Sequence, residues 1–150
     1  MTSVPTSERL PFFVYGTLRA GEGNHSWALA GKTASEVPAT LAGGEMYTNG
    51  GYPYVIRTDN PAEVVVGEIM TPTDAMYEQV LTALDRLETY VPGREDNHYD
   101  RVVVEVTTTD GETVRAFTYV ASPSMYDHAR SFPRVLSGDF VKDGKRAFAY

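Results

Sequence analysis

The chain has 150 residues and a formal net charge of −7, from 13 basic and 20 acidic side chains, and it contains no cysteine. An acidic chain without a basic run is a poor nucleic-acid binder, and no apolar stretch approaches the length of a membrane span. The lack of cysteine excludes disulfides, thiolate catalysis and cysteine-ligated metals. Since the first residues also show no signal-peptide pattern, we expect a cytoplasmic protein.

The length predicts one domain with a single substantial core. Residues 1–11 are polar and contain proline, so we expect a flexible N-terminal arm there. A single domain is then expected over residues 12–150, because no repeat or linker divides that part of the sequence.

The first segment with a clear pattern, residues 12–19, reads FFVYGTLR. Its apolar start predicts a short buried strand. Gly16 ends the strand at a turn, where a positive φ angle would require glycine. A strand broken in this way leaves consecutive backbone N–H groups that can form a concave anion site. The alternative is an ordinary first strand with a glycine turn, and local chemistry alone leaves both interpretations open.

The middle of the chain combines turns with short extended segments. We expect a short helix over residues 24–30 and a strand over residues 37–47. Residues 52–56 alternate around Pro53, which indicates an edge strand. Residues 64–70 are a nearly continuous apolar run and predict a buried strand.

Residues 71–90 carry the strongest helix signal. Thr73 or Asp74 can cap its start, and the sequence Val-Pro-Gly after Tyr90 ends it. An apolar stripe recurs within it at helical spacing, formed by Tyr77, Val80, Leu81, Leu84 and Leu87.

The last third of the chain returns to strands. Residues 101–108 and 113–121 are predicted strands, joined by the hairpin signal Asp110-Gly111. Residues 125–131 are a further helix candidate, and Gly138-Asp139 indicates a turn. Many short strands with one clear helix predict an α+β fold, with the strands curled into a mixed sheet or small barrel.

Glu88 is the residue with the most suggestive position. It follows Leu84 by four residues and Tyr77 by eleven, which places it near the middle of the apolar stripe, whereas Asp85 lies nearer the edge. A carboxylate in an apolar pocket has a raised pKa, which suits proton transfer near neutral pH. The alternative is that Glu88 lies at a frayed helix end and reaches solvent or Arg101.

Five motifs in a fixed order give a resemblance to a known family. They are YGTLR with its Gly-rich turn, GGEMYTNGGYPYVI from Gly43, VVGEIM from Val65, LDRLETY from Leu84 and YDRVVVEV from Tyr99. Together they resemble the gamma-glutamylcyclotransferase-like family over residues 12 to about 120. The resemblance implies a small barrel with the pocket at one mouth.

The resemblance also implies roles for particular residues. Glu88 matches the glutamate that serves as the catalytic acid–base. Substrate binding is implied for the first loop, whose backbone amides would hold a carboxylate, and for a later strand: Tyr15, Gly16, Thr17, Leu18 and Tyr119. Tyr99 and Arg101 match a supporting Y-x-R motif, in which Arg101 steadies Glu88 or forms a surface pair. A core position remains the alternative for Tyr119, and Asp139 has no assigned role.

The implied reaction acts on a small γ-glutamyl amine or a γ-glutamyl-capped metabolite and needs no metal or cofactor. The substrate's α-amine attacks its own γ-carbonyl, which releases 5-oxoproline and a free amine. One alternative is a lyase of the same mechanism that unmasks a protected intermediate in a biosynthetic pathway. Another is a non-catalytic module that binds a small carboxylate. The motifs specify neither the leaving amine nor the oligomeric state.

Overall fold

The computed structural model describes residues 9–16, 19, 29, 31–48, 53–88, 90–91 and 97–141. Within them, five strands close into a barrel in the order β1, β5, β2, β6, β7. Their bounds are β1 Phe12–Val14, β2 Thr33–Ala42, β5 Val64–Pro72, β6 Tyr99–Thr108 and β7 Thr113–Ala121. Strands β3 (Gly44–Thr48) and β4 (Pro53–Arg57) form a separate two-stranded sheet. The predicted α+β fold with a mixed barrel is therefore confirmed.

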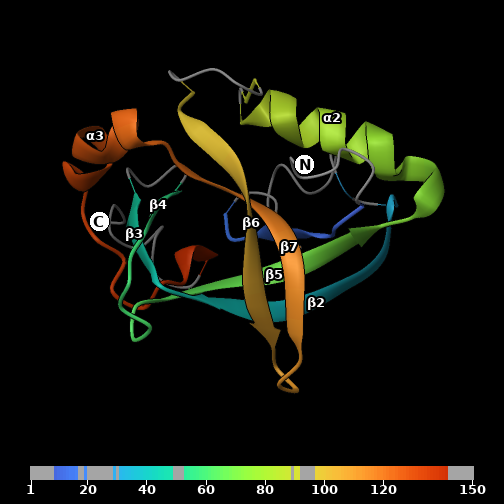
Figure 1. Ribbon diagram of the computed structural model, residues 1–150, viewed down its shortest axis with the longest axis horizontal. Helices are drawn as coiled ribbons and strands as arrows, with labels where there is room; N and C mark the ends of the chain where they lie inside the picture. Colours follow the sequence, from blue (N-terminus) through green and yellow to red (C-terminus); the bar gives the residue numbers. More distant parts are fainter. Residues whose placement is uncertain are drawn as a thin grey trace, which may run out of the picture.

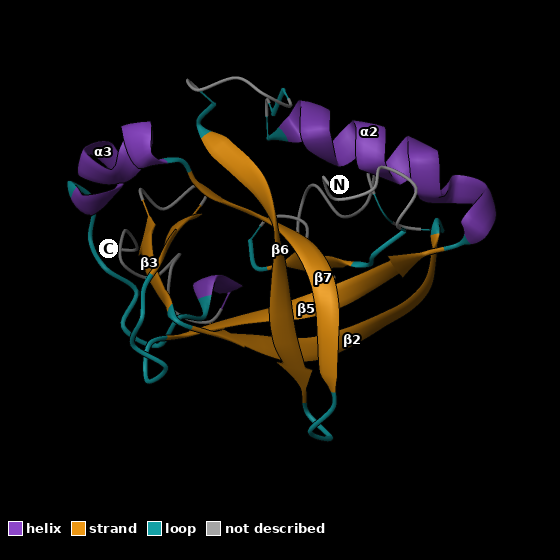
Figure 2. Cartoon of the chain, viewed as in Figure 1, coloured by secondary structure: helices purple, strands orange, loops and turns teal. Residues whose placement is uncertain are grey.

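Two α-helices accompany the described strands: α2 (Tyr77–Leu87) and α3 (Tyr126–Arg130), each preceded by a short 3₁₀ turn, Asp74–Met76 and Pro123–Met125. Figure 1 shows α2 lying across one end of the barrel, with the β6–β7 turn at the opposite end. The same view coloured by secondary structure places α3 beside the β3–β4 pair (Figure 2). No helix in the described part of the chain is long and apolar enough to cross a membrane.

The barrel closes between its first and last strands. Neighbouring strands are antiparallel except β1 and β7, which pair in parallel at Phe12 and Phe117. Strand β1 passes so close to β5 that a side chain at Gly67 would overlap the carbonyl oxygen of Val14. Glycine at this position therefore permits the tight crossing that closure requires.

The core consists of two apolar clusters separated by the wall of the barrel. Because successive strand residues point to opposite faces, Phe12 and Val14 of β1 join one cluster, whereas Phe13 joins the other. The first cluster also contains Tyr77 and Leu84 of α2. The apolar stripe of the helix is thus buried against one end of the barrel, as its spacing predicted.

Two predicted boundaries are wrong for identifiable reasons. The strand expected over residues 37–47 starts earlier and breaks at Gly43, whose φ of 87° is a conformation that other residues rarely adopt. The helix expected from residue 71 begins as α2 only at Tyr77, because Thr71 and Pro72 continue β5 in register with β2. Long-range strand pairing has overridden the local helix signal in that segment.

The chain is already packed against the barrel before β1 begins. Leu10 is buried, and its carbonyl accepts a hydrogen bond from Tyr77 Oη at 2.7 Å. The carbonyl of Pro11 accepts another from the Phe117 N–H at 2.8 Å. Residues 9–11 of the expected arm thus belong to the folded body, whereas residues 1–8 and most of the helix expected over residues 24–30 lie outside the described residues.

Candidate active site

Glu88 stands at the C-terminal end of α2, where its N–H donates to the carbonyl of Leu84 at 3.0 Å. Because residues four apart lie on the same face of a helix, Glu88 is on the face of α2 that contains the buried Leu84. Burial raises the pKa of Glu88 from 4.5 to about 7. Glu88 does end the helix, and its side chain is half-buried there.

Two tyrosines lie within the electrostatic reach of Glu88. Burial, followed by the charge of Glu88, raises the pKa of Tyr15. The pKa of Tyr119 is raised by burial, then by the charge and hydrogen bond of Asp85, and to a smaller extent by the charge of Glu88. Tyr15 Oη donates to the carbonyl of Tyr119 at 2.5 Å, which ties the end of β1 to β7. Tyr15 and Tyr119, which the sequence singled out, are therefore in direct contact, and Glu88 lies within electrostatic reach of both.

Asp85 is a member of this group that sequence reasoning undervalued. Its Oδ1 accepts a hydrogen bond from Tyr119 Oη at 2.5 Å, and its Oδ2 accepts one from Arg101 Nη1 at 2.6 Å. The sequence placed Asp85 nearer the edge of the apolar stripe and did not predict these two contacts. The available signal was the spacing of three residues between Asp85 and Glu88, which puts both carboxyl groups on adjacent parts of one helix.

Arg101 forms its ion pair with Asp85, and the two side chains are only 17% and 21% exposed. Its guanidinium also lies 5.2 Å from the ring centroid of Tyr90 and 5.1 Å from that of Phe117. The expectation of a surface pair is therefore wrong, because Arg101 is held between two aromatic rings while it bridges β6 to α2.

Glycine is needed at position 16 because of close packing and not because of a positive φ angle. Among the described glycines, positive φ occurs at Gly31, Gly43, Gly111 and Gly138 only, so the expected backbone reason is wrong. A Cβ atom at Gly16 would lie 2.8 Å from Cδ of Pro53, which is too close. The carbonyl of Pro53 in turn accepts a hydrogen bond from Tyr99 Oη at 3.0 Å. Tyr99 thus supports the first loop through Pro53.

The first loop is anchored again at Arg19. Its N–H donates to the carbonyl of Gly16 at 3.1 Å, which closes a turn. Its guanidinium contacts Asp139 Oδ1 at 2.9 Å and Glu68 Oε2 at 3.4 Å. All three side chains are less than one fifth exposed. Thr17 and Leu18, predicted to bind substrate through their amides, lie outside the described residues.

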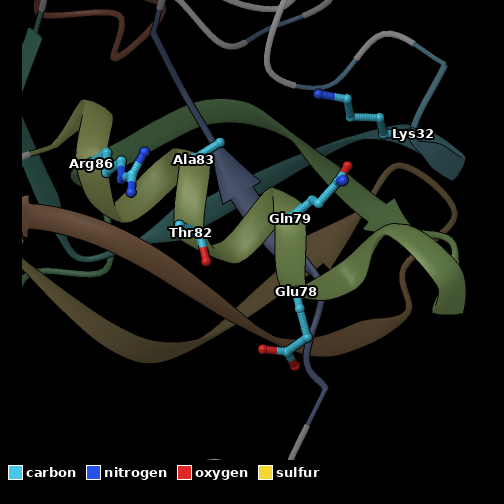
Figure 3. A pocket seen from close by; sticks show the side chains of 6 residues that line it. All are labelled: Lys32, Glu78, Gln79, Thr82, Ala83 and Arg86. Atoms are coloured by element: carbon cyan, nitrogen blue, oxygen red, sulfur yellow. The ribbon is translucent and has the colours of Figure 1, made fainter.

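A shallow groove runs along the exposed face of α2 (Figure 3), and none of the residues that line it belongs to the site described above. Five of its residues come from the exposed side of the helix, and the sixth, Lys32, comes from the turn before β2. The residues that line it are Lys32, Glu78, Gln79, Thr82, Ala83 and Arg86. Since Val80 and Leu84 face the barrel, Glu88 does not open into this groove.

The site can move a proton near neutral pH. A carboxyl group with a pKa of about 7 is half ionised there, so it can act as base and acid in successive steps. In the described part of the chain, no three His, Asp or Glu side chains gather as a metal site would require. The titratable carboxyl group of Glu88, with two phenols in its electrostatic reach, makes this end of the barrel a candidate acid–base site.

Comparison with known proteins identifies the class. The family model "Gamma-glutamyl cyclotransferase, AIG2-like" matches residues 12–142. The gamma-L-glutamyl-butirosin B gamma-glutamyl cyclotransferase of Niallia circulans is 34% identical over 119 residues, which are 79% of this chain and 70% of that protein. A putative gamma-glutamylcyclotransferase of Halalkalibacterium halodurans is 40% identical over 81 residues, 53% of this chain and 65% of that protein.

The fold agrees with this match. An AIG2-like protein from Mus musculus superimposes with a TM-score of 0.69 at 21% identity and covers 94% of each chain. The chain belongs to the gamma-glutamyl cyclotransferase, AIG2-like family, and it is an enzyme of that class.

Proposed function

We propose that the enzyme cleaves a small γ-glutamyl amine or a γ-glutamyl-capped metabolite and releases 5-oxoproline and a free amine, with Glu88 as the acid–base. The observation that carries this proposal is a carboxyl group with a pKa of about 7 beside Tyr15 and Tyr119. Membership of the family supports the reaction class, and the Niallia circulans relative, named for a γ-glutamyl-capped metabolite, supports the substrate class.

The reaction conserves atoms and protons. The α-amine nitrogen of the substrate bonds to its own γ-carbonyl carbon, and the bond from that carbon to the leaving amine breaks. The attacking nitrogen gives one proton to the Glu88 carboxylate, and protonated Glu88 passes it to the leaving nitrogen. Glu88 ends in its starting state, so a single carboxyl group suffices. Because the attack is intramolecular, holding the substrate in a folded conformation supplies much of the rate.

The first loop is the proposed carboxylate site. Backbone amides of Tyr15, Gly16, Thr17 and Leu18 would hold the substrate's α-carboxylate and help polarise its carbonyl. The packing of Gly16 against Pro53 and the turn that ends at Arg19 support this proposal, because both restrict where the loop can run. Tyr119 would contact the substrate from β7.

The direct test is a panel of γ-glutamyl amines with leaving groups of increasing size, ending with γ-glutamyl-butirosin B, with 5-oxoproline measured by mass spectrometry. The matched controls are the α-glutamyl isomers, in which the amine and the scissile carbonyl cannot close the same ring. We expect 5-oxoproline from at least one γ-linked compound and from none of the α-linked ones. Binding of a small carboxylate without any turnover would instead favour the non-catalytic module.

A further inference from the structure

The hydroxyl group of Tyr119 has its single hydrogen committed within the protein. That hydrogen is donated to Asp85 Oδ1, with the two oxygens 2.5 Å apart. A phenol carries one donor and two acceptor lone pairs. Toward any other group, the Tyr119 hydroxyl therefore presents lone pairs only.

The other phenol near Glu88 is committed in the same way. Tyr15 Oη donates to the backbone carbonyl of Tyr119 at 2.5 Å, and Tyr15 is 6% exposed. Both hydroxyl groups can accept a hydrogen bond, and neither has a second hydrogen to donate to the Glu88 carboxylate. Toward a substrate, both hydroxyl oxygens therefore act as acceptors, which is what an N–H donor requires.

We infer that Asp85 and Arg101 are positioning residues that fix the Tyr119 hydroxyl as an acceptor for an N–H of the substrate's attacking α-amine. The inference rests on the proposed function. Arg101 Nη1 binds Asp85 Oδ2 at 2.6 Å, while the rings of Tyr90 and Phe117 restrict the guanidinium. The carboxyl group of Asp85 is held at both oxygens, which leaves Oδ1 turned toward Tyr119.

This arrangement favours the orientation of the substrate's α-amine in which the amine can attack. An amine poised to attack directs its lone pair at the γ-carbonyl carbon and must place its N–H groups on acceptors. Glu88 receives one of these hydrogens as its proton, and the Tyr119 hydroxyl oxygen holds another. A Tyr119 hydroxyl turned toward Glu88 would instead stabilise the carboxylate and lower its strength as a base.

The substitution Asp85→Asn tests the inference, because Arg101 determines the orientation of the new asparagine side-chain amide. Arg101 offers only donors, so the amide oxygen faces Arg101 and the NH₂ group faces Tyr119. The NH₂ group then donates to the Tyr119 oxygen, and the Tyr119 hydrogen is released toward Glu88. The variant thus changes the direction of one hydrogen bond at nearly constant volume.

The measurement is the pKa of Glu88, followed by carbon-13 NMR of its carboxyl group, in four proteins: wild type, Asp85→Asn, Tyr119→Phe and the double variant. Among the described residues, Tyr119 and Arg101 contact Asp85, the ring of Tyr90 lies against Arg101, and the charge of Glu88 acts on Tyr15 and Tyr119. Loss of the Asp85 charge lowers the pKa of Glu88 whether residue 119 is tyrosine or phenylalanine. The effect of the Tyr119 hydroxyl group is therefore the difference between the pKa changes that Asp85→Asn causes in these two proteins.

We expect Asp85→Asn to lower the pKa of Glu88 by about one unit more when Tyr119 is present than in the Tyr119→Phe background. In turnover, Asp85→Asn should reduce kcat/KM by roughly 10- to 100-fold with Tyr119 present and only slightly in the Tyr119→Phe background. Equal pKa changes in both backgrounds would overturn the inference, since Asp85 would then act through its charge or its ion pair alone.

The titration needs no substrate, so it separates this inference from the proposed function. Inert wild-type protein with a background-dependent pKa change would refute the reaction and keep the hydrogen-bond arrangement. Active wild-type protein in which the pKa of Glu88 changes equally in both backgrounds would support the reaction and refute the hydrogen-bond arrangement. Should Asp85→Asn fail to fold, the hydroxyl proton of Tyr119 in wild-type protein gives the answer. Nuclear Overhauser effects to Asp85 support the inference, whereas effects to Glu88 overturn it.

Discussion

Asp139 Oδ1 accepts a hydrogen bond from Arg19 Nη1 at 2.9 Å, across 120 residues of sequence. The contact joins the end of the first loop to the turn that follows Gly138, where any side chain would overlap the carbonyl of Val64. The turn is therefore fixed against β5, and Asp139 holds Arg19 from a rigid position. The loop that is proposed to bind the substrate's carboxylate is fastened at its far end by this ion pair.

We predict that Asp139→Asn lowers the free energy of unfolding by about 1–3 kcal/mol, because among the described residues it leaves the largely buried guanidinium of Arg19 with Glu68 alone as a carboxylate partner. KM should rise more than kcat falls, since the loop and not the acid–base is disturbed. The control is Glu78→Gln, whose pair with Arg9 is 3.6 Å long and exposed, and which should cost under about 1 kcal/mol. Chemical denaturation that ranks the two variants equally would contradict the anchoring role.

Glu88→Gln should give a folded protein that still binds substrate but turns it over about 10²–10⁴-fold more slowly, because glutamine cannot carry the proton. Its stability at pH 7 should be unchanged or higher, since a buried carboxyl group no longer has to ionise. Glu78→Gln on the outer face of the same helix serves as the matched control and should keep full activity. Near wild-type turnover by Glu88→Gln would remove Glu88 from the mechanism.

The raised pKa of Glu88 predicts how stability depends on pH. Between pH 4.5 and about 7 the unfolded chain has released this proton and the folded protein retains it. The native state then binds more protons, so the free energy of unfolding falls as pH rises through this window, by at most about 3 kcal/mol. Wild type should therefore lose stability relative to Glu88→Gln between pH 4.5 and 8. A difference that stays constant with pH would show that the carboxyl group is not desolvated.

The same ionisation predicts a limit on catalysis at low pH. The Glu88 carboxylate must be ionised to accept the proton of the attacking amine, so kcat/KM should fall below pH of about 7. A profile of kcat/KM between pH 5 and 8 would locate this limb. A rate that is flat across that range would assign the first proton transfer to another group.

Gly16→Ala should impair substrate binding more than folding. The added Cβ would lie 2.8 Å from Cδ of Pro53, so the first loop must shift away from β4. We expect a clearly raised KM with a nearly unchanged melting temperature. Adding Pro53→Ala removes the obstructing ring and should restore KM, which separates a steric cause from a general loss of stability. Failure of this rescue would mean that the glycine matters for another reason.

The sequence by itself determined the features that depend on neighbours within a few residues. The apolar run of β1, the hairpin at Asp110-Gly111 and the buried stripe of α2 all arise from local periodicity and turn chemistry, and all are found in the structure. The inward direction of Glu88 follows from the same periodicity, because a helix repeats its faces at fixed spacing.

Only the tertiary structure decided which distant groups meet. Asp85 and Arg101 are 16 residues apart, Tyr15 and the Tyr119 carbonyl 104, and Arg19 and Asp139 120. Closure of the barrel between β1 and β7 and the placement of α2 across its end bring the first two pairs together, and packing of the Gly138 turn against β5 brings Asp139 to Arg19. A periodic pattern fixes the face on which a residue lies, but the partner on that face depends on how the strands pair, and strand pairing is set by the whole chain.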